Sequence, residues 1–182
     1  MSRIRIIFNG MSELAGNDQL LIIMMADEKR QRQVGFVCDK MTAVQIGMRV
    51  KKVEGISTML PEVLCSILSR LSGATMELNI NTVDNGQYRC FLCFGPGWIE
   101  PIPVRISDAV LLSVIADVPV YMDEKLFARQ STDINKDDRR VSLPINSLST
   151  EMLQEALDKA IREEKYELAA LLRDEQLRRE TK

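Results

Sequence analysis

The segment at residues 107–116, SDAVLLSVIA, constrains the fold more than any other part of the sequence. From Ala109 onward its side chains would be apolar on every side of a helix, and such a helix is stable only when other elements cover it. Ser107 is a suitable N-cap, and Asp108 in the first turn can interact with the helix dipole and pair with Arg105. The chain of 182 residues is long enough to build a domain around this helix.

Strands are predicted by runs of apolar and β-branched residues that are separated by polar or glycine-bearing segments. These runs lie at residues 3–8, 19–25, 32–38, 75–83, 87–94, 98–104 and 118–122. Between two of them, the Asn85-Gly86 pair predicts a tight hairpin turn. Pro101 and Pro103 place the run that contains them at an edge or an end of a sheet, because proline cannot donate a ladder hydrogen bond.

Two amphipathic helices are expected between the third and the fourth of these strands. The first follows Asp39, with Ala43, Ile46, Val50 and Val53 turned inward and Thr42, Gln45, Arg49 and Lys52 turned outward. The second has Pro61 in its first turn and ends near Gly73. Its apolar face consists of Leu60, Val63, Leu64, Ile67, Leu68 and Leu71. The pattern predicts an α+β fold in which a mixed β-sheet packs with helices.

The absence of histidine excludes a large group of catalytic mechanisms. Zinc hydrolases, histidine-dependent nucleases and serine or cysteine triads use imidazole as a base or as a metal ligand. Any hydrolysis by this chain would therefore depend on carboxylates, with a hard cation such as Mg²⁺ or Mn²⁺. The formal net charge of −2 gives no general attraction to nucleic acid, so binding of DNA or RNA has weak support from composition.

The cysteines are expected to remain reduced and to pack as small apolar residues. They are Cys38, Cys65, Cys90 and Cys93. Cys90 and Cys93 lie three residues apart on a predicted strand and would point to opposite faces, so no metal ligand is assigned. No apolar run is long enough to span a membrane, and the N-terminal residues do not resemble a signal peptide. We expect a cytoplasmic protein that does not enter a membrane.

Residues 2–128, and above all RISDAVLLSVIADVPVYM, resemble the bifunctional nuclease (BFN) family, which has an Asp-x-Arg-Pro-Ser-Asp-Ala motif before a similar apolar helix. Arg105, Ser107, Asp108 and Ala109 match this motif. The resemblance implies a self-associating α+β domain that cleaves DNA and RNA with the help of a metal ion. It also makes Asp108 and Glu62 the candidate metal ligands and Arg105 the candidate phosphate contact.

Several positions depart from the pattern of that family. Pro103 stands where the first motif aspartate is expected, and Ile106 stands in place of the motif proline. Lys40 falls on an expected glutamate, and Pro61 falls on an expected histidine. These departures leave two candidate carboxylates, which is few for a two-metal site. The alternative to a catalytic role is a structural one, in which Arg105 and Asp108 stabilise the start of the buried helix.

The C-terminal part divides into a polar linker at residues 129–149 and a predicted helical hairpin at residues 150–182. Ser149 or Thr150 caps the first helix, whose apolar face contains Leu153, Ala156, Leu157, Ala160 and Ile161. The segment KYELAALLRDE resembles the UVR domain of bacterial excision-repair subunits and of some chaperone regulators. The matching residues are Tyr166, Glu167, Ala169, Ala170, Arg173 and Asp174. The resemblance implies a partner-binding hairpin, and a hairpin that packs on its own domain is the alternative.

Two classes of function follow from these patterns. The residues favour a homo-oligomeric scaffold whose hairpin binds another helical surface, either that of its own copy or that of a UVR-bearing protein. The family resemblance favours a metal-dependent nuclease that acts on DNA or RNA.

Overall fold

A mixed sheet of eight strands forms the centre of the molecule, in the order β6-β5-β4-β7-β1-β2-β3-β8. The computed structural model describes residues 2–14, 17–70, 75–95, 99–134 and 145–180. The strands are β1 Arg3–Leu14, β2 Asn17–Asp27, β3 Arg32–Asp39, β4 Met76–Asp84, β5 Gln87–Phe94, β6 Ile102–Val104, β7 Val120–Asp123 and β8 Thr132–Asp133. Among the described strands, β4 and β7 pair in parallel, whereas the other neighbours are antiparallel. The predicted α+β class with a mixed sheet is confirmed.

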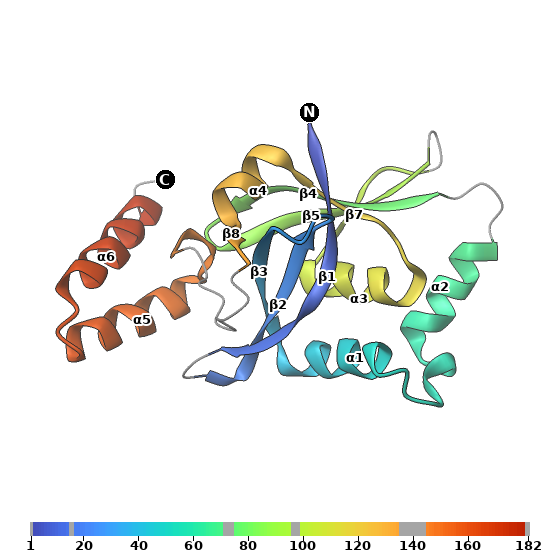
Figure 1. Cartoon of the computed structure of the whole chain (residues 1–182), viewed down its shortest axis with the longest axis horizontal. Coiled ribbons are helices and arrows are strands. Elements are labelled where there is room, and N and C mark those ends of the chain that lie inside the picture. Colours follow the sequence, from blue (N-terminus) through green and yellow to red (C-terminus); the bar gives the residue numbers. More distant parts are fainter. Residues whose placement is uncertain (1, 15–16, 71–74, 96–98, 135–144, 181–182) are drawn as a thin grey trace.

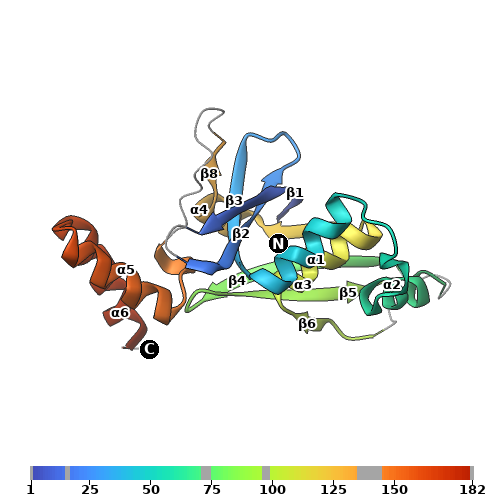
Figure 2. The same ribbon diagram turned by 90° about the horizontal axis from the view of Figure 1, so that it is seen from below.

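The helices of the domain are α1 Lys40–Val50, α2 Leu60–Arg70, α3 Ile106–Ala116 and α4 Glu124–Gln130. Figures 1 and 2 show α1 and α3 side by side against the sheet, with α2 at one end of α3. The sheet is strongly curved. Strands β5 and β3 are separated by four other strands in the sheet, yet Phe36 of β3 and Tyr88 of β5 meet with their ring centroids 4.7 Å apart. Helix α3 contacts β3, β5 and β7, and therefore lies in the concavity of the sheet.

The inner face of the sheet is a continuous apolar layer. Fully buried side chains from successive strands are Ile6, Ile23, Met25, Val34, Phe36, Leu78, Ile80 and Met122. They follow the register of the ladders, in which Ile80 pairs with Met122 and Ile23 pairs with Phe36. In α3, Ala109, Val110 and Leu111 are buried against this layer. Burial of the apolar helix is therefore confirmed.

The predicted turns and edges are also confirmed. Asn85 and Gly86 join β4 to β5 with φ values of 48° and 78°, as a two-residue hairpin turn requires. Strand β6 lies at one edge of the sheet, with Pro103 inside it. Strands β1 and β2 extend well beyond the predicted runs at 3–8 and 19–25, because their pairing continues to Leu14 and Asn17.

Three details of the helix predictions are wrong. Helix α3 begins at Ile106 with Arg105 as its N-cap, and Ser107 lies buried in the first turn instead of capping it. In α1, Thr42 and Arg49 are buried instead of exposed. The Thr42 hydroxyl donates to Asp39, and the Arg49 guanidinium pairs with Glu62 of α2.

The third detail concerns α2. Four residues of its predicted apolar face, Leu60, Val63, Leu64 and Ile67, are exposed, Leu68 is partly buried, and Cys65 is buried instead. In α1 and after it, Val50 and Val53 are likewise exposed. The proposed stop at Gly73, together with Leu71, lies outside the described residues.

The C-terminal residues form two antiparallel helices, α5 Thr150–Arg162 and α6 Tyr166–Glu180, which project from one end of the domain (Figure 1). Ser149 is the N-cap of α5, and its hydroxyl accepts a hydrogen bond from the backbone N–H of Met152. Leu153, Leu157, Ala160, Ala169 and Leu172 are buried between the two helices. Helix α4 and strand β8 continue past residue 128, the predicted end of the core. Among the described residues, no helix has the length and apolar character needed to cross a bilayer.

Candidate functional site

Two helices begin close together at one corner of the domain and bring three charged side chains with them. Strand β3 ends at Asp39, which is the N-cap of α1. Strand β6 leads through Arg105 into α3, whose first turn contains Asp108. Because α1 and α3 pack against each other, residues distant in the sequence share this corner. Asp39 was not among the candidate residues drawn from the sequence, although the Asp-x-x-Thr spacing after a strand is a capping signal.

The guanidinium of Arg105 links both carboxylates. Its Nε donates to Asp108 Oδ2 at 2.7 Å and its Nη2 donates to Asp108 Oδ1 at 3.0 Å. Its Nη1 lies 3.9 Å from Asp39 Oδ2. The predicted pairing of Arg105 with Asp108 is confirmed, and the side chain of Arg105 keeps 69% of its area exposed. The result is an ion triad at the surface.

Hydrogen bonding fixes the charge of Asp39. Asp39 Oδ1 accepts from the backbone N–H of Thr42 and Oδ2 accepts from its hydroxyl, both at 2.8 Å. The backbone hydrogen bond is the main reason that the pKa of Asp39 is lowered, and Arg105 contributes to the same effect. In contrast, burial raises the pKa of the neighbouring Cys38 to about 12, so this thiol stays protonated and does not act as a nucleophile.

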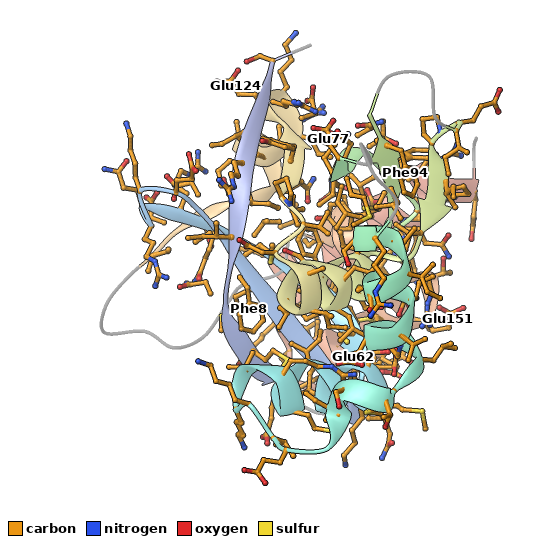
Figure 3. All side chains as sticks on the ribbon, turned by 90° about the vertical axis from the view of Figure 1, so that its right-hand side faces the viewer. Phe8, Glu62, Glu77, Phe94, Glu124 and Glu151 are labelled. Atoms are coloured by element: carbon orange, nitrogen blue, oxygen red, sulfur yellow. The ribbon has the colours of Figure 1, made fainter. Side chains whose placement is uncertain are left out.

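Glu62 does not join this corner. It forms a bidentate ion pair with Arg49 of α1, with Arg49 Nε and Nη2 each 2.7 Å from a carboxylate oxygen. The pair is largely buried, with 4% of the Arg49 side chain and 14% of the Glu62 side chain exposed. Figure 3 labels Glu62 at the place where α2 adjoins α1. In the described part of the chain, Glu62 thus ties α2 to α1, whereas Asp108 is paired with Arg105.

The corner does not fit a metal ion of the kind that the family implies. Divalent hard cations need several oxygen ligands, and the described residues contain no group of three or more His, Cys, Asp or Glu side chains placed to hold a metal. The two carboxylates available, Asp39 and Asp108, already face the guanidinium of Arg105. Chemically, this corner offers an exposed cation held between two anions.

We expect Asp108→Asn to destabilise the protein only slightly, by less than about 1 kcal/mol, because the pair with Arg105 is solvent-exposed. The substitution keeps the size of the side chain and removes its charge from the first turn of α3. A urea titration of both proteins measures the change. A loss of several kcal/mol would show that the triad holds the fold together, contrary to this prediction.

The residues that resemble the UVR pattern lie on different sides of α6. Ala169 is buried against α5, with 9% exposed, whereas Ala170 next to it is exposed. Tyr166, Glu167, Arg173 and Asp174 are all exposed. Ala169 therefore serves the contact between the two helices, and a partner would have to bind through the exposed set.

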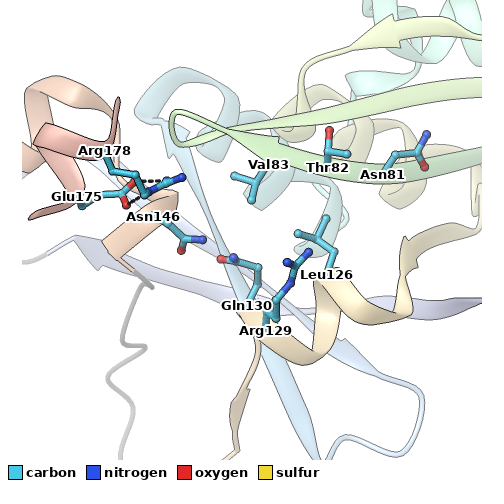
Figure 4. A pocket seen from close by; sticks show the side chains of 9 residues that line it. All are labelled: Asn81, Thr82, Val83, Leu126, Arg129, Gln130, Asn146, Glu175 and Arg178. Atoms are coloured by element: carbon cyan, nitrogen blue, oxygen red, sulfur yellow. Dashed lines mark hydrogen bonds and ion pairs between the residues drawn. The ribbon is translucent and has the colours of Figure 1, made fainter. Parts of the chain in front are cut away.

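A cavity of about 390 Å³ separates the helical pair from the sheet domain. Figure 4 shows its lining, with Thr82 and Val83 from β4, Leu126, Arg129 and Gln130 from α4, and Glu175 and Arg178 from α6. Arg178 is paired with Glu175 at 2.7 Å. No pattern in the sequence identified this junction, because it forms from residues far apart in the chain.

A curved mixed sheet around an apolar helix, with an Asp-Arg-Asp triad where two helices begin, defines an α+β domain. The model of the bifunctional nuclease domain matches residues 22–135, and the chain belongs to this family. The match covers most of the sheet, α1 to α4 and the ion triad, and it ends before α5. A search of curated proteins found no similar sequence.

Proposed function

We propose that this member of the bifunctional nuclease family is a scaffold, which associates with a second copy of itself through α2 and recruits a protein partner through α5 and α6. The observation that carries the proposal is the exposed apolar row on α2. The residues of this row, which we call the α2 stripe, are Leu60, Val63, Leu64 and Ile67.

The α2 stripe has the spacing of a helix contact face. Leu60 lies three and four residues before Val63 and Leu64, and Ile67 lies three and four residues after Leu64 and Val63, so the four side chains lie on one side of the helix. Their exposed fractions are 79%, 40%, 45% and 54% in chain order. Contiguous apolar area of this kind on a protein surface is characteristic of interaction sites.

A second copy of the chain suits the α2 stripe because the stripe itself carries no charge. The acidic residue of this helix, Glu62, turns inward and is neutralised by Arg49. Two identical apolar helices can pack across a twofold axis without opposing like charges. A charged partner would find no complementary group along this row.

Replacing Leu64 and Ile67 together by glutamate should abolish self-association. Burial of two carboxylates in an apolar contact is strongly unfavourable, so we expect the dissociation constant to rise by about 100-fold or more. Sedimentation velocity over a range of concentrations measures this change, and circular dichroism confirms that the fold is intact. Ser66→Glu, on the same helix but outside the stripe, is the matched control and should behave as the unmodified chain does.

If the unmodified chain sediments as a monomer at all concentrations, self-association through α2 is wrong. If the double variant sediments like the unmodified oligomer, copies associate through another surface.

Partner recruitment is supported by the outer surface of the helical pair. Tyr166, Leu168 and Leu171 of α6 are exposed by 69%, 42% and 58%, and Ile161 of α5 is exposed by 51%. Acidic and basic side chains alternate with them, which suits contact with another helix better than contact with phosphate. Because α5 and α6 resemble the UVR pattern, the expected partner is another helical hairpin of the same kind. In the sedimentation experiment, Leu168→Glu with Leu171→Glu should leave the α2-mediated association unchanged.

Cleavage of nucleic acid should stay near background. The basis for this expectation is the triad, in which Arg105 engages both available carboxylates, and the separate position of Glu62. Highly purified protein is incubated with single- and double-stranded DNA and RNA in the presence of Mg²⁺ or Mn²⁺. Robust cleavage that disappears in Asp108→Ala, with the fold unchanged, would identify the chain as an active nuclease.

A further inference from the structure

A second cavity lies on the outer face of the sheet, away from the triad and from the α2 stripe. Its volume is about 680 Å³, within the range of about 300–1,000 Å³ in which small-molecule sites fall. It is lined by Ser2, Arg3, Asn79, Asn81, Thr82, Phe91, Cys93, Pro101, Met122, Asp123, Lys125 and Arg129. The lining combines an apolar floor, a group of small polar side chains and several cations, and we call it the outer groove.

The floor of the outer groove contains one aromatic ring. Phe91 of β5 is partly exposed and is paired in register with Asn79 on one side and Pro103 on the other. Pro101 adds further apolar surface. A flat ring system can stack on such a side chain, and this kind of stacking accepts any aromatic base.

Polar side chains lie beside this floor because β4 is irregular. The pairing of β4 with β5 shifts between Ile80 and Thr82, which leaves Asn81 as an extra residue. Such a bulge changes the direction of the following side chains. Asn81 and Thr82 are both exposed and both line the outer groove. An amide and a hydroxyl offer donors and acceptors together, as the edge of a nucleobase or a sugar requires.

Cations border the groove on the side of α4. Lys125 and Arg129 are one turn apart and exposed, and in the described part of the chain neither has an anionic partner. Asp123 accepts a hydrogen bond from the N–H of Leu126 and is thereby engaged as the N-cap of α4. Arg3 lies over the ring of Tyr121 at 4.1 Å and is held by Glu77 and Asn79. On a chain with a net charge of −2, this local excess of cations favours an anion.

We propose that the outer groove binds a mononucleotide, with the base against Phe91 and the phosphate against Lys125 and Arg129. A purely apolar ligand would leave the cations unused, and a bare phosphate would leave the aromatic floor uncovered. The site shares no residue with the triad or with the α2 stripe, so it holds or fails independently of the scaffold function.

Cys93 provides a direct probe, because it lines the outer groove and is partly exposed, whereas Cys38, Cys65 and Cys90 are buried. The full chain is treated with N-ethylmaleimide, and labelling is followed by intact mass, with Cys93→Ser as proof of the site. AMP, GMP, CMP and UMP are added in turn. At a concentration ten times the dissociation constant, a bound nucleotide should slow labelling by about tenfold.

Adenosine alone and inorganic phosphate alone should protect Cys93 far less than AMP. In Lys125→Gln with Arg129→Gln, labelling without ligand should keep its rate, and protection should be lost because the dissociation constant rises by about tenfold or more for each charged contact. The matched control is Lys159→Gln with Arg162→Gln on α5, which removes two cations from one helix outside the groove. This control should be protected as well as the unmodified chain is.

The proposal is overturned if none of the four nucleotides slows the labelling of Cys93. It is also overturned if phosphate alone protects as well as AMP does, or if protection survives in the Lys125 and Arg129 double variant.

Discussion

Glu62→Ala should lower the free energy of unfolding by about 3–5 kcal/mol, because it leaves a buried cation without its partner. The guanidinium of Arg49 donates to both oxygens of Glu62 and to the backbone oxygen of Gln45, and its side chain is only 4% exposed. No other described acidic side chain forms an ion pair with Arg49. A change of this size would be among the largest that a single substitution can cause.

Urea denaturation, followed by circular dichroism, measures the effect. The control replaces both partners, Arg49→Met with Glu62→Met, and should recover most of the lost stability, because apolar side chains of similar volume avoid the unpaired charge. If Glu62→Ala and the double variant are equally destabilised, Glu62 contributes to stability through packing and not through its charge. A loss below about 1 kcal/mol in Glu62→Ala would mean that water reaches Arg49.

Gly86→Ala should displace α5 and α6 from the sheet domain. A Cβ atom at Gly86 would overlap the backbone oxygen of Leu148 and lie 3.0 Å from the backbone nitrogen of Ser149, which caps α5. These are backbone atoms, so a side-chain rotation cannot relieve the overlap. The left-handed backbone of Gly86, with φ of 78°, adds a further cost of about 1–2 kcal/mol for any other residue.

Gly55→Ala separates the effect of backbone strain from the effect of overlap with a neighbouring segment. Gly55 also has a positive φ of 83°, but an added Cβ there would meet nothing within 4 Å. Both variants should therefore lose about 2–8 °C in melting temperature from backbone strain. Only Gly86→Ala should also increase hydrogen exchange at residues 145–153. Equal exchange in the two variants would mean that the helical pair does not depend on this contact.

The strands of the sheet and the buried helix could be predicted because short stretches of sequence specify them. The Asn85-Gly86 pair specifies a turn whatever surrounds it, and the prolines around Ile102 exclude a central strand. The helix of residues 106–116 had to be buried because no side of it is polar. The helical pair was also predictable, because α5 has one apolar face and a serine cap.

What could not be predicted depends on contacts between distant residues. Arg49 looks like an outward residue of α1, and its burial follows only from the position of Glu62 in another helix. The apolar row on α2 looks like a core face, yet the core is already filled by α3 and the sheet, so α2 is left at the end of the layer. Asp39 entered the candidate site only because two helices begin side by side. Spacing along one segment cannot show which of its faces meets another segment.

The position of β7 also determines when this protein can fold. This short strand pairs with β1 on one side and β4 on the other, and it supplies the ladder that joins β1–β3 to β4–β6. Arg3 must meet Asp123, so a ribosome has to release almost the whole domain before the sheet can close. Until then β1 and β4 each keep an unpaired edge. Pairing β1 with β7 also closes the long chain segment between these strands, which has an entropic cost. We therefore expect slow refolding, and aggregation of nascent chains that end before Val120.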